Sequence, residues 1–330
     1  MVRSIDQAAP SREQLITFYR QMQLIRRFEE AAAVAYQRRK IGGFLHLYIG
    51  EEAVAVGAIG SLQPQDYIVS SYREHGHAIA RGLDINALMA ELFGKVTGVS
   101  RGKGGSMHLF DETKGFLGGY AIVAGQMPIA TGLGLSASMR GEDRVCMCFF
   151  GDGAVNEGEF HEALNLASLW KTPVVFICEN NLYGMGTALA RHSAMQEIYR
   201  RAEAYNMPSE RADGMDVLAT YATVQKAVEH ARGGNGPYFI EAMTYRFRAH
   251  SMADPELYRT KDEVNVWRQR DPIPRLRAHM VEQGVATEED LNALDAVIER
   301  TVDEAVRFAD ESPEPPISEL WEHVYVGNYR

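Results

Sequence analysis

The sequence predicts an α/β fold, in which a doubly wound and mainly parallel sheet is flanked by helices. Two short apolar runs carry the aromatic and β-branched residues of buried strands, and they end at Gly151-Asp152-Gly153 and at Glu179-Asn180-Asn181. Between them, apolar residues from Phe160 to Trp170 have helical spacing. A strand–helix–strand unit of this kind is right-handed, so we expect its two strands to be parallel neighbours.

Helical spacing, caps and breakers predict the elements of the N-terminal half. Ser11 can cap a long helix, and Gly42-Gly43 follows its end. One stretch is dense in glycine and is predicted to be a long loop, and long ordered loops usually carry function. In chain order, we expect a helix over 11–40, a helix over 51–62, a strand over 67–71, this loop over 94–126 and a helix over 128–139 that opens at Pro128.

The C-terminal half is assigned from the same signals. Thr287 and Asp290 indicate a capped helix start. In chain order, we expect a loop with a helix over 195–204, a turn over 212–216, an amphipathic helix ending near 232–234, a strand over 238–245 and a helix from Thr287 that ends before Ser312–Pro316. We predict one domain over 1–330, with N-terminal helices (1–62), an α/β core (63–260) and a C-terminal helical extension (261–330).

Composition restricts the class of protein and its partners. With 46% hydrophobic and 24% charged residues, the 330-residue chain has the make-up of a soluble globular protein. A net charge of −10 argues against nucleic acid and against an anionic membrane as partners. No apolar run is long enough to span a membrane and no leader is evident, so we expect a cytoplasmic protein. Cys146, Cys148 and Cys178 lie in the strand runs and are expected to be buried, reduced thiols.

The polar residues that follow the two strands indicate a phosphate and metal site. Both sets emerge at the carboxyl ends of parallel strands, where open α/β sheets bind ligands. Gly151 and Gly153 let backbone N–H groups approach a phosphate. Asp152 and Asn181 are hard oxygen donors of the kind that Mg²⁺ takes together with phosphate oxygens and water. The alternative is an ordinary strand-to-helix turn with Asp152 as the helix N-cap.

Arg73 follows the predicted strand 67–71 and is a second candidate for phosphate binding. A guanidinium offers two parallel donors to phosphate oxygens, and a strand end would place it at the same edge of the sheet. The alternative is a surface arginine that pairs with Glu74 or Asp66.

Two further motifs indicate other chemistry, but their context does not support it. His75 and His77 could begin a zinc site, yet no third ligand follows at a suitable spacing. Residues 132–137 fit the dinucleotide fingerprint G-x-G-x-x-A, which needs a strand directly before it. Pro128 stands where that strand would run, so we expect a helix whose glycines allow close packing instead.

Six strings in the chain resemble one family. Gly-Asp-Gly at 151–153, followed after residues 154–179 by Asn-Asn, matches the thiamine diphosphate motif. The fuller string GDGAVNEGEFHEALNLASLW…ENNLYGMGT resembles the alpha subunits of heterotetrameric, thiamine diphosphate-dependent 2-oxo acid dehydrogenases. Further matches are GEEA from Gly50, YREHG from Tyr72, RGKGGSMH from Arg101, GYAIVAGQ from Gly119 and HSMADP from His250. The last string favours the pyruvate branch of the family over the branched-chain branch.

This resemblance implies the thiamine diphosphate-binding fold, with thiamine diphosphate and Mg²⁺ as cofactors, and it assigns site residues. Mg²⁺ would bind the side chains of Asp152 and Asn181 and the backbone carbonyl of Tyr183. The diphosphate would contact Tyr72, Arg73, Gly153 and Ala154, whereas main-chain groups at Ala121 and Val123 would hold the aminopyrimidine ring. His250 would touch the cofactor phosphate or stabilise the substrate intermediate, and it is the candidate catalytic residue.

The resemblance also implies a reaction and partners. The reaction would be oxidative decarboxylation of pyruvate, with transfer of the acyl group to a lipoyl group on an acyltransferase core. A partner beta subunit would supply the activating glutamate, so we expect the chain to be inactive alone and to form an α₂β₂ heterotetramer. Alternatives are the alpha subunit of an acetoin or a branched-chain 2-oxo acid dehydrogenase, or a non-catalytic thiamine diphosphate-binding subunit. Ser251 matches a phosphorylation site of animal members.

Overall fold

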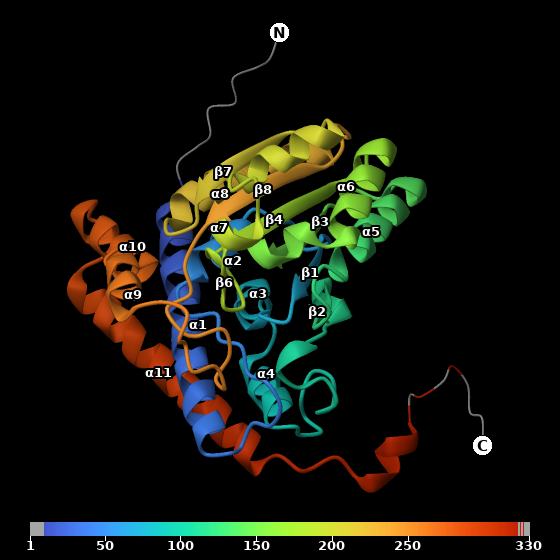
Figure 1. Cartoon of the computed structure of the whole chain (residues 1–330). Coiled ribbons are helices and arrows are strands. Elements are labelled where there is room, and N and C mark those ends of the chain that lie inside the picture. The colour runs from blue at the N-terminus through green and yellow to red at the C-terminus, as the bar shows by residue number, and fades with distance from the viewer. Residues whose placement is uncertain (1–9, 323, 325, 327–330) are drawn as a thin grey trace.

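A six-stranded sheet lies at the centre of the molecule, in the strand order β2-β1-β3-β4-β8-β7 (Figure 1). The computed structural model describes residues 10–322, 324 and 326. All neighbouring strands of this sheet are parallel, which confirms the predicted fold class. The strands are β1 (Tyr67–Ser71), β2 (Phe116–Tyr120), β3 (Cys146–Gly151), β4 (Val174–Asn180), β7 (Ser209–Asp213) and β8 (Tyr238–Met243).

The order of the strands reverses between β1 and β3. From β1 the chain continues to β2 on one side, whereas β3 leads to β4 on the other side. Ligands of open α/β sheets bind outside the carboxyl ends of the strands at such a point. The residues that follow β1, β3 and β4 are therefore placed where the sequence predicted a site.

Helices cover both faces of the sheet. The hydrophobic cluster on one face contains side chains of α1 (Arg12–Gln37), α2 (Glu52–Ile59), α3 (His75–Arg81), α4 (Ile85–Leu92) and α8 (Val217–Arg232). The other face packs against α5 (Gln126–Arg140), α6 (Gly158–Trp170) and the 3₁₀ helix η4 (Ile198–Tyr205). No helix in the described part of the chain is long and apolar enough to cross a membrane.

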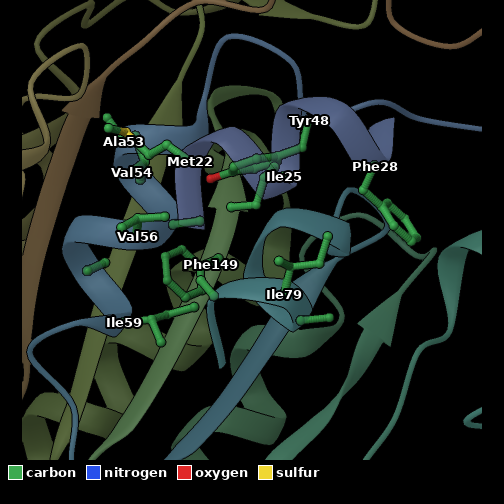
Figure 2. Close-up of a cluster of buried hydrophobic side chains, with 14 of the residues drawn as sticks. Met22, Ile25, Phe28, Tyr48, Ala53, Val54, Val56, Ile59, Ile79 and Phe149 are labelled. Carbon is green, nitrogen blue, oxygen red and sulfur yellow. The ribbon is translucent and has the colours of Figure 1, made fainter. Parts of the chain in front are cut away.

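Alternation along β3 divides the core into two clusters. Successive strand side chains point to opposite faces, so Phe149 packs with the first helix layer, whereas Cys146 and Cys148 pack with the second. Figure 2 shows Phe149 facing Val56 of α2 and Ile79 of α3. The cysteines are free and buried, as predicted, and burial raises the pKa of each thiol.

The C-terminal extension is helical, as predicted. It contains α9 (Lys261–Arg268), α10 (Pro272–Glu282), α11 (Glu288–Glu311) and the 3₁₀ helix η5 (Ile317–Trp321), and both α10 and α11 contact α1 (Figure 1). Thr287 and Asp290 form the predicted capping box at the start of α11. The division of the domain into segments at residues 62 and 260 stays a prediction. Residues 1–9 and 327–330, at the two ends of the predicted domain, lie outside the described part.

Short elements fill several connections between the main helices and strands. They are the 3₁₀ helices η1 (Gly105–Met107), η2 (Glu112–Lys114) and η3 (Asp152–Asn156), the hairpin of β5 (Tyr183–Gly184) and β6 (Thr187–Ala188), and α7 (Leu189–His192).

Several predicted boundaries were wrong. The helix predicted over 11–40 ends at Gln37, and the one over 51–62 ends at Ile59. The predicted loop 94–126 contains β2, and β7 occupies part of the stretch assigned to a loop and a turn. Both are edge strands: two glycines interrupt the pattern of β2, and charged residues suited to a sheet edge disguise β7. The helix expected over 195–204 is the 3₁₀ helix η4.

The dinucleotide alternative is excluded by α5. Residues 132–137 lie inside this helix, and no strand directly precedes it. A Cβ on Gly134 would come within 2.7 Å of the Val174 side chain, so this glycine allows α5 to pack closely on the start of β4.

Candidate active site

Two adjoining cavities open at the carboxyl edge of the sheet. The sheet-end cavity, of about 190 Å³, is lined mainly by residues that follow β1, β3, β4 and β8. The loop cavity, of about 590 Å³, is lined by residues of the surrounding loops. Tyr72, Val123 and Met185 line both cavities and so connect them. The predicted site residues are brought together here: Tyr72, Arg73, Val123, Asp152, Gly153, Ala154, Asn181 and Tyr183 line the sheet-end cavity, and Ala121, Val123 and His250 line the loop cavity.

Asp152 lies directly after β3 and does not cap a helix. The chain first forms η3, and α6 begins only at Gly158, with Glu157 as its N-cap position. The N-cap alternative for Asp152 is therefore wrong. The carboxylate is buried, and its Oδ2 lies 3.3 Å from Nε2 of His192.

Gly153 and Gly184 bring two segments of the cavity wall into close contact. A Cβ added to either glycine would lie 3.1 Å from the Cα of the other. Such a contact is tighter than side chains normally allow, so the turn after β3 can approach the β5 hairpin only because both residues lack a side chain.

Oxygen atoms of Asn181 and Tyr183 converge on one cation. Nη1 of Arg246 donates to Asn181 Oδ1 at 3.2 Å and to the Tyr183 carbonyl at 3.1 Å, and Nη2 donates to the Met185 carbonyl at 3.1 Å. These first two oxygens are those predicted to bind Mg²⁺. An oxygen of this kind has two lone pairs, so the Tyr183 carbonyl can accept from Arg246 and still bind a metal ion. Asn181 Oδ1 also accepts from the Tyr183 N–H at 3.4 Å, so a metal ion would replace one of its two donors. The donor set of carboxylate, amide and carbonyl oxygens fits a hard divalent cation.

Arg73 is buried at the end of β1 rather than paired on the surface. Its Nη1 donates to the Leu47 carbonyl at 2.6 Å and its Nη2 to the His250 carbonyl at 2.8 Å. The surface-pair alternative is wrong, because Glu74 accepts from a backbone N–H instead and Asp66 pairs with another arginine. Burial and the nearby Arg246 lower the pKa of Arg73, so an anionic ligand between the two guanidinium groups would relieve their repulsion.

Two buried carboxylates complete the sheet-end cavity. Glu51 accepts from Asn181 Nδ2 at 3.0 Å, and its other oxygen lies 3.7 Å from Arg73 Nε. Burial and the neighbouring Glu179 raise the pKa of Glu51 to about 7. Glu179 accepts from the Tyr48 hydroxyl and lies 2.9 Å from His77 Nε2. The cavity therefore combines carboxylates, guanidinium groups and amides, which is the lining expected for a charged ligand.

His75 and His77 do not form a metal site. His75 contacts a buried glutamate and Ser106, and His77 lies between Ser70 and the Tyr48–Glu179 pair. Across the described residues, no group of three or more His, Cys, Asp and Glu side chains could hold a metal ion. Both imidazoles are thus engaged in hydrogen bonds within the protein.

His250 lies in the loop cavity and is held there by its backbone. Its N–H donates to Asp254 Oδ2 at 2.9 Å and to the Tyr258 hydroxyl at 3.1 Å, and its carbonyl accepts from Arg73. The buried Nδ1 of the ring has no hydrogen-bond partner among the described residues. Burial and the charges of Arg73 and Arg246 lower the pKa of His250 to about 3, so its ring is neutral at pH 7 and Nδ1 is available to a ligand.

A second imidazole, His46, lies beside His250. The ring centroids are 5.0 Å apart, and His46 is 4.5 Å from the ring of Tyr72. Burial and Arg73 lower the pKa of His46 to about 2, and its Nδ1 also has no partner in the described part of the protein. The loop cavity therefore presents two neutral imidazoles to a ligand.

The loop after β2 contributes Ala121 and Val123 to the cavities. Ala124, the residue that follows Val123, has a φ of 66°, in the left-handed region, which marks a sharp turn before α5. Ile122 is exposed at this turn. The structure therefore places these positions at the cavity wall, as predicted, on a tightly turned loop.

Comparison with known proteins identifies the family. The family described as "Dehydrogenase E1 component" matches residues 20–318. The chain belongs to the dehydrogenase E1 component family. It is 46% identical over 325 residues to "Pyruvate dehydrogenase E1 component subunit alpha" of Porphyra purpurea, covering 96% of this chain and 94% of the relative.

Two further relatives have similar names. The protein of the same name from Rhizobium meliloti (strain 1021) is 46% identical over 312 residues, covering 94% of this chain and 90% of the relative. "Pyruvate dehydrogenase E1 component subunit alpha-3, chloroplastic" of Oryza sativa subsp. japonica is 45% identical over 327 residues, covering 96% and 77%.

Three residues that shape the site of this E1 family member were not predicted from its sequence. Arg246 and His46 were assigned no role, and Glu51 was quoted within the GEEA string without one. A single arginine after a strand, or a single histidine before a helix, has no pattern of its own. The position of Arg246 directly after the strong strand 238–245 was the one usable signal, since β8 ends at the same edge as β4.

Proposed function

We propose that this chain is the alpha subunit of a pyruvate dehydrogenase E1 component. The observation that carries the proposal is the meeting of Arg73, Asp152 and Asn181 in one cavity at the ends of β1, β3 and β4. Relatives that carry this name and cover most of the chain support it. The proposed reaction is oxidative decarboxylation of pyruvate, with transfer of the acyl group to a lipoyl group on an acyltransferase.

Asp152, Asn181 and Tyr183 would hold Mg²⁺ in the sheet-end cavity. The carboxylate, the amide Oδ1 and the backbone carbonyl supply oxygen only, and two of these oxygens already share a cationic partner in Arg246. Mg²⁺ usually keeps waters and substrate phosphates beside one or two protein ligands, which leaves positions for a diphosphate.

The diphosphate of thiamine diphosphate would lie between the turn after β3 and the turn after β1. Gly153 and Ala154 offer backbone N–H groups, and Tyr72 and Arg73 line the same cavity. Ala121 and Val123 would contact the aminopyrimidine by main-chain groups. When bound, the cofactor supplies a ring that acts as an electron sink for decarboxylation.

His250 is the proposed catalytic residue, and its neutral ring limits what it can do. With a pKa lowered to about 3, it can donate one hydrogen bond and accept another, but it carries no charge at pH 7. It would orient the substrate carboxylate or a cofactor phosphate oxygen by hydrogen bonding. Tyr72 and His46 line the same cavity and would exclude water from the reacting atoms.

A beta subunit is the proposed partner, in an α₂β₂ heterotetramer. Large apolar side chains that line the cavities or lie next to them are exposed: Phe44 by 61%, Ile122 by 73% and Met185 by 65%. A partner that covered these side chains would also close the cavities. A cytoplasmic location stays a prediction from the sequence, and neither nucleic acid nor membrane is proposed as a partner.

The test is reconstitution with the beta subunit and a substrate panel. The chain should be inactive alone and active with its partner, thiamine diphosphate and Mg²⁺, with pyruvate preferred over branched-chain 2-oxo acids and acetoin. Preference for acetoin would make it an acetoin dehydrogenase subunit instead. Turnover at a normal rate by the purified chain alone would contradict the division of the site between two subunits.

A further inference from the structure

His192 contacts the sheet-end cavity from outside it, and the proposed function gives it no role. It is the last residue of α7, and its side chain is largely buried against the turn after β3. Its Nε2 lies 3.3 Å from Oδ2 of Asp152. A histidine that contacts a predicted metal-binding carboxylate can either orient the carboxylate or compete for the metal ion, so the position of its proton decides the role.

A chain of hydrogen bonds around Asn156 indicates where that proton lies. Arg201 can only donate, and its Nη1 lies 2.9 Å from Asn156 Oδ1, so the amide nitrogen of Asn156 points the other way. This nitrogen lies 3.2 Å from Nδ1 of His192, 2.9 Å from the His192 carbonyl and 3.3 Å from Ser193 Oγ, and it can only donate. A donor at Nδ1 favours the arrangement in which Nε2 carries a proton.

The Ser193 hydroxyl adds a second possible donor at Nδ1, at 3.0 Å. Nε2–H then points at Asp152 Oδ2, which accepts. Among the described residues, no hydrogen bond reaches the other carboxylate oxygen, Oδ1, although Asp152 lines the cavity. The network thus binds one oxygen of the carboxylate and leaves the other for a cation.

We propose that His192 is a positioning residue for the metal site, acting through Asp152. It donates Nε2–H to Oδ2 and holds the carboxylate so that Oδ1 is presented to Mg²⁺. The inference rests on the proposed function, because it concerns the same metal site. Partners of metal-binding groups set ligand orientation, and their loss typically weakens metal binding by about 10- to 100-fold.

The decisive measurement is metal affinity in the assembled enzyme. Mg²⁺ binding to the α–β complex with thiamine diphosphate is measured by calorimetry, for the wild type and two variants. His192→Leu, which keeps volume but removes the donor, should bind Mg²⁺ roughly 10- to 100-fold more weakly. His192→Gln, whose amide nitrogen can donate to Oδ2, should stay within about 3-fold of the wild type, well below that range.

His161→Leu is the matched control. His161 is an exposed imidazole on the neighbouring α6 that contacts Tyr205 and does not line the cavity, so its loss should leave Mg²⁺ affinity unchanged. Circular dichroism checks that every variant is folded. If His192→Leu does not fold, His192→Ala takes its place, with the same expected loss of Mg²⁺ affinity.

Mn²⁺ in place of Mg²⁺ separates positioning from direct binding. Electron spin echo spectra of the wild-type complex should show no nitrogen of a histidine bound to Mn²⁺. A directly coupled imidazole nitrogen, or His192→Leu with unchanged metal affinity, would overturn the inference. Absence of any cofactor-dependent metal binding by the wild type would instead overturn the proposed function, so the two failures are distinguishable.

Discussion

The two cavities are built by different means, although they adjoin. The sheet-end cavity takes its charged groups from positions next to strand ends, and buried hydrogen bonds fix Arg73, Asn181 and Arg246. The loop cavity takes its residues from separate loops, and it presents His46 and His250 without charge. The strand ends of the fold therefore supply the charged groups that can bind a charged part of a ligand. The loops supply uncharged groups that can contact the rest of the ligand.

The cavities also differ in how complete they are. The sheet-end cavity already contains oxygen donors for a metal and two guanidinium groups for an anion. Around the loop cavity, apolar side chains such as Phe44 remain exposed. We therefore expect changes in the first cavity to act on cofactor binding, and changes in the second to act on turnover.

The largest effect is expected from Asp152→Ala. It removes a carboxylate proposed to bind the metal directly, so Mg²⁺ affinity should fall by more than the roughly 100-fold that loss of an outer partner costs. Calorimetry on the reconstituted enzyme measures the Mg²⁺ affinity, and an activity assay measures the turnover. Asp303→Ala, on the exposed side of α11, is the control. Unchanged turnover would show that the metal site was assigned to the wrong residue.

Arg246→Met should have the next largest effect. It removes a buried cation that donates to three oxygens of the cavity wall, and hydrogen bonds of a charged group contribute about 1.5–3 kcal/mol each. Thiamine diphosphate affinity should fall by roughly 10- to 100-fold, since about 1.4 kcal/mol is a factor of ten. The exposed Arg248→Met is the control on the same loop. If Arg246→Met and Arg248→Met bound thiamine diphosphate with equal affinity, Arg246 would have no role in cofactor binding.

The two neutral imidazoles of the loop cavity should make stability depend on pH. Burial and Arg73 lower the pKa of His46 to about 2 and that of His250 to about 3. Below their ordinary pKa of about 6.5, the unfolded chain binds protons that the folded chain does not. The free energy of unfolding should therefore fall between pH 7 and pH 5, by up to about 2 kcal/mol per imidazole.

Urea unfolding of His46→Gln/His250→Gln beside the wild type tests this dependence. The double variant should lose less stability than the wild type between pH 7 and pH 5. Burial is the main cause that raises the pKa values of Glu51 and Glu74 to about 7, so these two carboxyl groups make stability rise as the pH falls. This contribution is present in both proteins. The informative quantity is therefore the difference between the two slopes of unfolding free energy against pH. Identical slopes would mean that the imidazoles titrate normally in the folded state.

The smallest effect is expected from Asp254→Ala, which acts on the loop cavity alone. Asp254 accepts from the N–H groups of His250 and Glu256 and from the Tyr258 hydroxyl, each at 2.9 Å. Its loss should speed hydrogen exchange over residues 246–259 and lower turnover about tenfold, equivalent to about 1.4 kcal/mol. Metal affinity should not change. Leu257→Ala, exposed on the same loop, is the control. A loss of metal affinity in Asp254→Ala as large as its loss of turnover would contradict the separation of the cavities.

The central strands and the sheet-end cavity were predictable, because their signals are local. β3 and β4 are uninterrupted apolar runs, and the residues after them belong to one motif. β2 and β7 were missed because edge strands tolerate glycine and charge, which hide the alternating pattern. The extents of α1 and α2 were overestimated by about one turn, since apolar spacing does not show where the chain leaves a helix.

His46 could not be found in this way, because tertiary structure alone places it, and Arg246 offered only its position after a strand. Nothing near His46 in the sequence indicates that it will meet His250 across the cavity. The pKa values of both imidazoles follow from burial and from Arg73, which is also distant in sequence. The His192 network likewise depends on the meeting of η3, α7 and η4.

The parallel sheet has a consequence for how the protein forms. Each crossover separates strand neighbours by many residues, so Arg73, Asp152 and Arg246 meet only after most of the chain has folded. Such non-local topology slows folding. A cofactor that binds only the finished site stabilises it by mass action. The steady-state amount of this protein should therefore rise and fall with the supply of its cofactor, even when its synthesis is constant.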